Sequence, residues 1–335
     1  MSHQAGVGQG SGGAAAQVAR TPAPDHSARG TGGRDRHAEG RWRSRIQVPD
    51  ALRHPRAWLR AILRDACLGV LQAVHFRQPE NTLISSSRTY WGDLRSERKQ
   101  EDSHWRGAGR FEDDARWLAL GQEHFEIYEE FSRAVNFRRP RRIAEWGCGG
   151  GINAVRFGPL ADVFYGIDIS PDSLQECARQ TQSAGLHNFT PVLIDAANPE
   201  AVLTRIESCD LVISTYVFEA LPSPEYGVRV LRIIGEVLSP GGMAVIQTKY
   251  KERGRATASR RWNYARNLAW NATYRIEEFW QLAKSCGLSP KMVKLQPEQP
   301  LVSDRNYAYF CLRKVPEADR HAKEDETPGR VSASF

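Results

Sequence analysis

The sequence predicts an α/β fold: a doubly wound seven-stranded sheet, with five parallel strands and a C-terminal antiparallel pair, preceded by a helical N-terminal extension. Three observations predict it. From residue 142 onward, apolar strand-like runs alternate with helical patterns, as in parallel βαβ units. A glycine-rich segment, 147–151, follows the first of these runs. The last two runs, 292–295 and 307–312, are joined by a loop short enough for an antiparallel pair.

The elements follow in order along the chain. Strands are expected at 143–146, 163–169, 189–194, 211–217, 243–248, 292–295 and 307–312. Ser170 and Pro171 are typical of the cap and first turn of a helix, which we expect to continue through Ala184. Further helices are expected at 117–135, 225–238 and 275–286, where apolar residues recur at helical spacing. The segment 239–242, Ser-Pro-Gly-Gly, is typical of a turn.

Composition divides the rest of the chain. Residues 1–45 are rich in Gly, Ala, Arg and Ser with almost no large apolar side chain, so we expect a disordered tail there, and another over the polar residues 316–335. Residues 46–137 are expected to form a helical and loop-rich extension, with a helix over 57–76 and an irregular lid over 85–116. The sheet domain is expected over 138–315, with an insertion at 249–274.

Charge and cysteine usage narrow the function classes. The formal net charge is +7, but residues 1–60 contain ten Arg, no Lys and four acids, so the body of the chain is nearly neutral. That disfavours nucleic acid as the partner without excluding it. The six cysteines are scattered without a C-x-x-C pair, so we expect reduced thiols, no metal site and a cytoplasmic location. No apolar run approaches the roughly 18 residues of a membrane span.

The glycine segment carries the main functional signal. Glu145 ends a short apolar run, and Gly147, Gly149 and Gly151 follow it. Glycines at this spacing let the backbone approach a ligand closely and adopt φ values that other residues avoid. A dinucleotide-binding G-x-G-x-x-G fingerprint would need a third glycine at position 152, where this chain has Ile152. The pattern E-x-G-x-G-x-G therefore disfavours an NAD-binding protein.

Polar residues follow three later strands, at the sheet edge where open α/β folds bind ligands. Asp168 stands 17 residues after Gly151, where a carboxylate can accept both ribose hydroxyls of a nucleoside. Asp195 ends the third strand and can accept from an adenine amino group, with the backbone of Ala196 against a ring nitrogen. Ser214 and Tyr216 end the fourth strand and are expected to face the reacting centre.

These segments together resemble the motifs of the class I S-adenosylmethionine-dependent methyltransferase family. The motifs are 145–151, 166–170, Asp195, 210–221 and 238–246, and the resemblance spans 142–314. It implies S-adenosylmethionine as cofactor. The residues that it implies for cofactor binding are Glu145, Gly147, Gly149, Gly151, Asp168, Ile169, Asp195, Ala196 and Ser214. The family's motifs specify the cofactor much better than the methyl acceptor.

Glu219 and Tyr216, in the segment after the fourth strand, are the catalytic candidates. Glu219 matches an acid of the family's loop, but Ala220 stands where many members have His, so no histidine base is assigned. The acceptor pocket is expected between the aromatic segments 90–105 and 249–274. We expect O-methylation of a small-molecule or glycan-type acceptor. An RNA or protein methyltransferase using the basic tail is the alternative, and an NAD-binding Rossmann-like protein is disfavoured.

Overall fold

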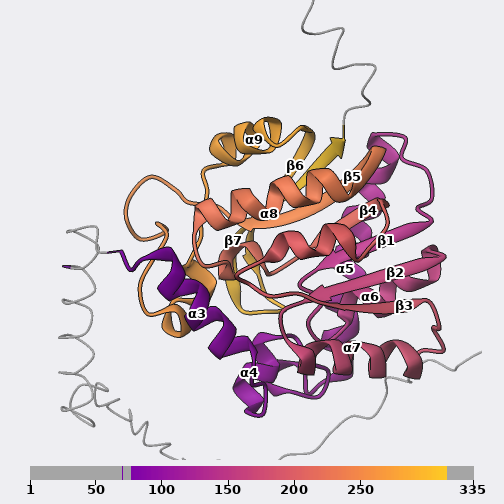
Figure 1. Ribbon diagram of the computed structural model, residues 1–335, viewed down its shortest axis with the longest axis horizontal. Coiled ribbons are helices and arrows are strands. Elements are labelled where there is room, and N and C mark those ends of the chain that lie inside the picture. The colour runs from indigo at the N-terminus through magenta and orange to yellow at the C-terminus, as the bar shows by residue number, and fades with distance from the viewer. Residues whose placement is uncertain (1–69, 71–76, 315–335) are drawn as a thin grey trace, which may run out of the picture. The chain divides into compact units, whose positions relative to one another are not determined.

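The computed structural model describes residue 70 and residues 77–314. Within them, seven strands form one sheet in the order β3-β2-β1-β4-β5-β7-β6 (Figure 1). The strands are β1 Arg142–Trp146, β2 Val163–Asp168, β3 Phe189–Leu193, β4 Cys209–Ser214, β5 Leu238–Lys249, β6 Leu288–Gln299 and β7 Asp304–Lys314. Strands β1 to β5 pair in parallel, and β7 runs antiparallel to both β5 and β6. The predicted fold class is confirmed.

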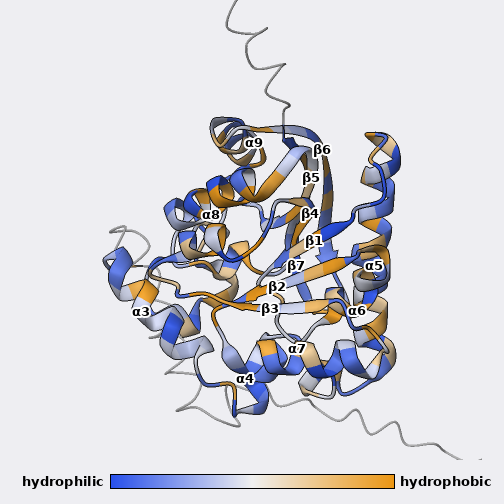
Figure 2. Ribbon diagram, turned by 45° about the vertical axis from the view of Figure 1, so that its right-hand side comes forward, coloured by the Kyte–Doolittle hydropathy of each residue, from blue (hydrophilic) through white to orange (hydrophobic). Residues whose placement is uncertain are grey.

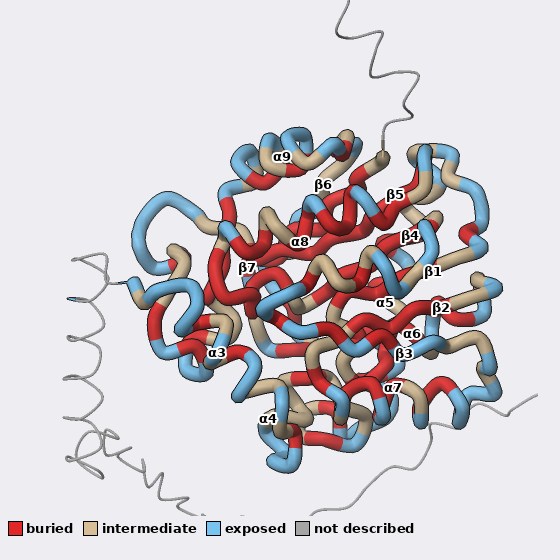
Figure 3. The backbone as a smooth tube through the Cα atoms, in the orientation of Figure 1, coloured by how far each residue is buried: buried red, intermediate tan, exposed pale blue. Residues whose placement is uncertain are grey.

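Helices cover both faces of this sheet (Figure 1). The α-helices are α3 Glu80–Trp91, α4 Glu97–Asp102, α5 Asp114–Ala134, α6 Ile152–Phe157, α7 Pro171–Ser183, α8 Pro224–Val237 and α9 Ile276–Ser285. Short 3-10 helices lie at Gly109–Phe111, Gly158–Leu160, Pro199–Thr204, Phe218–Ala220, Tyr264–Arg266 and Leu268–Trp270. Residues of α8 and α9 share one buried apolar cluster with the sheet, and residues of α5, α6 and α7 share the other. Figure 3 shows the strands buried between these layers.

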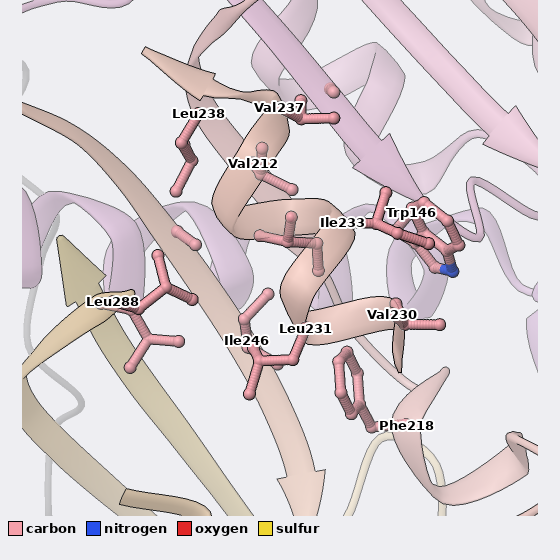
Figure 4. Packing of buried hydrophobic residues seen from close by; sticks show 14 of the residues in the cluster. Trp146, Val212, Phe218, Val230, Leu231, Ile233, Val237, Leu238, Ile246 and Leu288 are labelled. Atoms are coloured by element: carbon pink, nitrogen blue, oxygen red, sulfur yellow. The ribbon is translucent and has the colours of Figure 1, made fainter. Parts of the chain in front are cut away.

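Helix α8 shows how the sequence produces this packing. Ser223 caps it, with its hydroxyl oxygen accepting from the Tyr226 backbone N–H at 3.0 Å, and Pro224 fits the first helical position. Its apolar stripe, which includes Leu231, lies against β4, β5 and Leu288 (Figure 4). Burying each large aliphatic side chain of this kind contributes about 1.5–3 kcal/mol. Truncating Leu231 to Ala should therefore cost about 2–5 kcal/mol.

Helix α7 fixes the chain next to a functional candidate. Ser170 caps it through the Ser173 backbone N–H at 3.2 Å, and Pro171 occupies the first turn. Asp168, at the end of β2, therefore lies two residues before a helix N-terminus. In Figure 2 the helices carry both hydrophobic and hydrophilic residues, as expected when one face of each packs on the sheet.

The structure departs from the sequence predictions at three places. The segment 239–242 is part of β5 and not a separate turn, because β5 begins at Leu238 beside Cys209 and the register shifts before Leu211. Strands β6 and β7 extend several residues beyond their predicted ends and pair along their length. The predicted irregular lid over 85–116 contains α3 and α4.

Other predictions concern residues that the structure does not describe. The tails over 1–45 and 316–335 lie outside the described residues, and so does the helix predicted over 57–76 apart from residue 70. Within the described part of the chain, no helix is long and apolar enough to cross a membrane. The same residues contain no group of three or more His, Cys, Asp or Glu side chains that could hold a metal ion.

Candidate active site

A cavity lies at the carboxyl ends of β1, β2 and β4. The glycine loop contributes Gly147 and Gly149 to its wall, and Glu145, Asp168 and Ile169 come from or follow the strands. Helices α3 and α4, with the segment that follows them, supply the opposite wall through Trp91 and residues 102–104. The structure therefore brings together most of the residues predicted for cofactor binding.

The glycines of the loop are explained by geometry and by their protein neighbours. Gly147, Gly149 and Gly151 have φ values of 76°, 47° and 88°, in the left-handed region that disfavours side chains. A Cβ on Gly147 would lie 2.4 Å from Val217, and one on Gly149 would lie 2.6 Å from the Ser103 carbonyl oxygen. Because Gly147 and Gly149 have no side chains, Val217 of the loop after β4 and Ser103 of the lid can pack directly against them. The glycine loop itself lines the cavity.

Gly150 makes a contact that no motif of the sequence predicted. Its backbone N–H donates to the Ser103 carbonyl at 2.8 Å, and a Cβ there would lie 2.6 Å from the His104 carbonyl oxygen. Gly151 packs instead against Cys177 of α7 and does not line the cavity. The lid and the glycine loop are therefore in direct backbone contact.

Asp168 is held by the backbone at the end of β2. Its Oδ2 accepts from the Gly149 N–H at 3.0 Å and its Oδ1 from the Ser170 N–H at 2.9 Å. Burial raises its pKa to about 6 against the lowering effect of these N–H groups. Asp168 lines the cavity, and a carboxylate has further acceptor capacity beyond these bonds.

Glu145 belongs to a buried polar network behind the glycine loop. Asn153 of α6 donates to Glu145 Oε1 at 2.7 Å and to the Thr215 hydroxyl at 3.0 Å. Its Oδ1 accepts from His124 Nδ1 at 2.8 Å, because a carbonyl oxygen can only accept. Glu145 Oε2 is buried and has no hydrogen-bond partner in the part of the chain that the structure describes. Burial raises the pKa of Glu145 well above its ordinary value, although the bond from Asn153 opposes the rise.

Three residues predicted to bind the cofactor, Ala196, Asp195 and Ser214, lie in different positions relative to the cavity. Ala196 lines the cavity, and its carbonyl accepts from the Tyr226 hydroxyl at 2.6 Å. Asp195 is exposed, pairs with Arg88 of α3 at 3.2 Å, and does not line the cavity. Ser214 is buried, donates to the Trp146 carbonyl at 3.1 Å, and also does not line it. Ser214 thus joins β4 to β1.

Tyr216 adopts a backbone conformation that bulky residues avoid. Its φ is 59°, and its N–H donates to the Gln247 side-chain oxygen, which holds the strained residue in place. Its ring lies edge-on to His104, with centroids 4.8 Å apart, and edge-on to Tyr307 at 5.2 Å. Burial raises the pKa of Tyr216 well above its usual value, so the phenol stays protonated near neutrality.

A second cavity, of about 260 Å³, lies beside the first. Five residues line both: Trp91, Asp102, His104, Tyr216 and Ala220. The second cavity is walled by residues 98–110 of the lid, by residues 265–270 of the insertion, and by the start of β7. Trp262, in contrast, is buried and lines neither cavity.

Glu219 lines this second cavity and is 3% exposed. Its Oε2 has no hydrogen-bond partner among the described residues. Burial raises the pKa of Glu219 to about 7, and the Lys249 cation opposes the rise. The histidines nearby behave differently: burial lowers the pKa of His104 to about 3 and that of His124 to about 4. Among the described residues that line the second cavity, Glu219 is thus the carboxyl group whose pKa is raised toward neutral pH.

Side-chain hydrogen bonds connect the lid to the rest of the site. Trp91 of α3 donates its indole N–H to the Tyr264 hydroxyl at 2.8 Å, and Tyr264 donates to the Ala220 carbonyl at 2.6 Å. Tyr90 donates to Asp102 within the lid. The chain Trp91–Tyr264–Ala220 therefore connects the lid, the insertion and the loop that carries Glu219.

The fold and this site define a class of protein. A parallel sheet with one reversed strand at its C-terminal end, a glycine loop after β1 and an acid at the end of β2 are the arrangement of class I S-adenosylmethionine-dependent methyltransferases. The family model for a methyltransferase domain matches residues 120–290, just over half of the 335-residue chain. The chain belongs to this family. The predicted resemblance and the predicted cofactor, S-adenosylmethionine, are confirmed.

Solved structures of similar fold include the N-methyltransferase NodS from Bradyrhizobium japonicum WM9 in complex with S-adenosyl-L-homocysteine. It is 15% identical to this chain with a TM-score of 0.41, and the match covers 56% of this chain and 86% of that one. The [4+2]-cyclase SpnF is 16% identical with a TM-score of 0.44, covering 57% and 80%. A methyltransferase from Clostridium acetobutylicum ATCC 824 is 12% identical with a TM-score of 0.44, covering 61% and 92%. No curated protein matches the chain.

Proposed function

We propose that this protein transfers the methyl group of S-adenosylmethionine to a hydroxyl group of a small-molecule or glycan-type acceptor, with Glu219 as the general base. The observation that carries the proposal is the buried, unpartnered Glu219 Oε2 in a cavity that adjoins the glycine-loop cavity. The two cavities share Ala220, the residue directly after Glu219, which supports a base close to the boundary between them.

The first cavity suits the cofactor. Glu145 Oε2 is a buried carboxylate oxygen that an ammonium group could satisfy, and Asp168 can accept from ribose hydroxyls. Ile169 and Ala196 line the same cavity and would pack against the nucleoside. Asp195 can reach an adenine amino group only with rearrangement of its ion pair with Arg88.

The bound cofactor supplies a methyl group on a positive sulfonium, and the protein supplies geometry, dryness and proton removal. A hydroxyl acceptor must lose its proton as the bond forms. Glu219, with a pKa raised to about 7, is a stronger base than an ordinary carboxylate and still partly ionised at neutral pH. Tyr216 stays protonated and can donate to the acceptor or shape its approach.

The charges around the second cavity are compatible with a neutral hydroxyl acceptor, and the unpartnered Glu219 is the carboxylate there that would attract an ammonium. An amine reaches the site as an ammonium, which a free carboxylate would attract. Two of the cavity's carboxylates are already paired, Glu101 with Arg110 and Asp304 with Lys249, both at 2.5 Å. The Lys249 cation, which lowers the pKa of Glu219, would repel an ammonium.

The test uses methyl-labelled S-adenosylmethionine with a panel of hydroxyl and amine acceptors. On a hydroxyl acceptor, Glu219→Gln should lower turnover by about 10²–10⁴, the range for a general base, with cofactor affinity nearly unchanged. Glu225→Gln is the matched control, because Glu225 is exposed on α8 and pairs with Arg261. Full activity of Glu219→Gln, or turnover of amines only, would refute the proposal.

A nucleic-acid or protein acceptor is the second candidate. Two arginines at the second cavity, Arg98 and Arg266, are exposed, and residues 1–60 carry a formal charge of +6 from ten Arg and four acids. Phosphate contacts by such groups weaken steeply as salt rises. Labelling of RNA that falls steeply between low and physiological salt would favour this candidate over a small acceptor.

A further inference from the structure

Lys249, the last residue of β5, is buried completely: its side chain is 0% exposed. Moving a charge of this kind out of water costs several kcal/mol unless it is paired. Its Nζ lies 2.5 Å from Asp304 Oδ2 and sits over the rings of Trp270 at 4.1 Å and Tyr307 at 5.0 Å. The antiparallel register of β5 and β7 places Lys249 opposite Tyr307, so the sheet itself creates this contact.

The partner of Lys249 is held in place from a second side. Asp304, at the start of β7, also accepts from the Tyr307 hydroxyl at 2.7 Å. Asp304 and Tyr307 both line the second cavity, as Glu219 does. Lys249, Asp304 and Tyr307 thus form a cluster of fixed charges and dipoles against the cavity that contains Glu219.

We propose that Lys249 is a positioning residue that keeps Glu219 ionised in the second cavity, and that Asp304 and Tyr307 hold its ammonium group for this purpose. The inference rests on the proposed function, in which Glu219 is the base. The electrostatic effects agree with the geometry: Lys249 lowers the pKa of Glu219, and Asp304 raises it.

Other charged groups face the same cavity and must be weighed. In the lid, Arg110 pairs with Glu101 at 2.5 Å, and Arg98 lies 4.0 Å from Asp102. Arg266 of the insertion is exposed, so solvent screens it. His104 is neutral at physiological pH because burial lowers its pKa to about 3. The tyrosines near Glu219 are a separate set. Tyr216 and Tyr307 line the cavity, and Tyr274 and Tyr309 interact with Glu219 electrostatically. Burial raises the pKa of each of these phenols, so they stay uncharged near neutrality.

A simpler role for the ion pair of Lys249 and Asp304 is structural: it would stabilise the pairing of β5 with β7. That role predicts that removing either partner weakens the sheet in the same way and leaves the ionisation of Glu219 where it was. The positioning role predicts opposite effects. Without Lys249 the carboxyl should hold its proton more strongly, and without Asp304 less strongly.

The experiment measures the ionisation of Glu219 directly in the full-length protein. Infrared spectra recorded across a pH series contain the carbonyl stretch of each protonated carboxyl group, and the signal absent from Glu219→Gln belongs to Glu219. We expect Lys249→Met to raise the midpoint by about one pH unit or more, a tenfold change in the ionisation constant, and Asp304→Asn to lower it. Lys249→Arg should restore a midpoint near that of the unaltered protein.

Lys251→Met is the matched control, because Lys251 lies two residues further on and pairs with Glu278 at 2.8 Å. It should leave the midpoint unchanged. If Lys249→Met does not fold, Asp304→Asn and Lys249→Arg still carry the test. Shifts in the same direction for Lys249→Met and Asp304→Asn, or none in either, would overturn the inference. An active Glu219→Gln combined with opposite shifts would instead refute only the role of Glu219 as base.

Discussion

Replacing Glu219 by Gln should change how the stability of the protein depends on pH, even without a methyl acceptor. Glu219 is 3% exposed, and burial raises its pKa from 4.5 to about 7. The folded protein therefore binds the Glu219 proton more strongly than the unfolded chain does. Stability from this group is fully present below pH 4.5 and is lost as the pH rises to about 7. Gln has no such titration, so the variant should escape this loss.

The magnitude follows from the two pKa values. The interval from 4.5 to about 7 corresponds to about 3 kcal/mol, at about 1.36 kcal/mol for each pKa unit. Most of this change falls between pH 5 and 8. Over that range the free energy of unfolding of Glu219→Gln should rise relative to the unaltered protein by about 2–3 kcal/mol. The absolute stability at one pH also includes the burial of the new amide, so the pH dependence is the quantity to compare.

Urea unfolding of both proteins at a series of pH values provides the measurement. Other titrating groups cancel in the difference as long as the substitution leaves them in place. Glu225→Gln, on the exposed side of α8, should give a difference that stays within about 0.5 kcal/mol over the series. A Glu219→Gln difference equally flat would show that the carboxyl is not buried as a raised-pKa acid, and the proposal for a general base would lose its physical basis.

Three further outcomes are expected. Asp168→Ala should weaken S-adenosylmethionine binding by about 1.5–3 kcal/mol in calorimetry, since hydrogen bonds to a charged group are lost, and NAD should not bind; tight NAD binding alone would contradict the cofactor assignment. Gly150→Ala should weaken cofactor binding and lower the thermal midpoint, because its Cβ would lie 2.6 Å from the His104 carbonyl oxygen. Removal of residues 1–45 should leave thermal midpoint and cofactor affinity unchanged, as their composition offers little apolar surface to pack; aggregation of the truncated protein would count against this.

The parallel part of the fold could be predicted because each strand and helix carries its own local signal. Ser170 and Pro171 predicted the start of α7, and the structure shows that cap. The helices of the lid carry weaker signals: Ser96 caps α4 through the Lys99 N–H, and no side-chain hydrogen bond caps α3. In α3 only Leu83 and Ser87 are buried, and α4 buries no residue, so no apolar periodicity marks them. Their position depends on contacts with distant segments, such as that between Trp91 and Tyr264.

The residues of the site could likewise be predicted only where their signal is local in the sequence. The acid and glycines of the loop lie within seven residues of one another, from Glu145 to Gly151, and together with the later motifs their spacing indicated the cofactor. The pair of Lys249 and Asp304 had no such signal, because 55 residues separate them and only the register of β5 and β7 joins them.

We expect the residues that line the second cavity to influence which acceptor binds. The family match ends at residue 290 and begins at 120. Many of the residues that line the second cavity come from the lid before residue 120, and Asp304 and Tyr307 come from β7 after residue 290. The glycine loop and Asp168, in contrast, lie inside the match. The residues proposed to bind the cofactor in the glycine loop and at Asp168 thus lie inside the family match, whereas much of the wall of the proposed acceptor cavity lies outside it. Trp91→Ala, which removes the contact to Tyr264 from outside the matched region, should therefore alter turnover and acceptor preference more than it alters the overall fold.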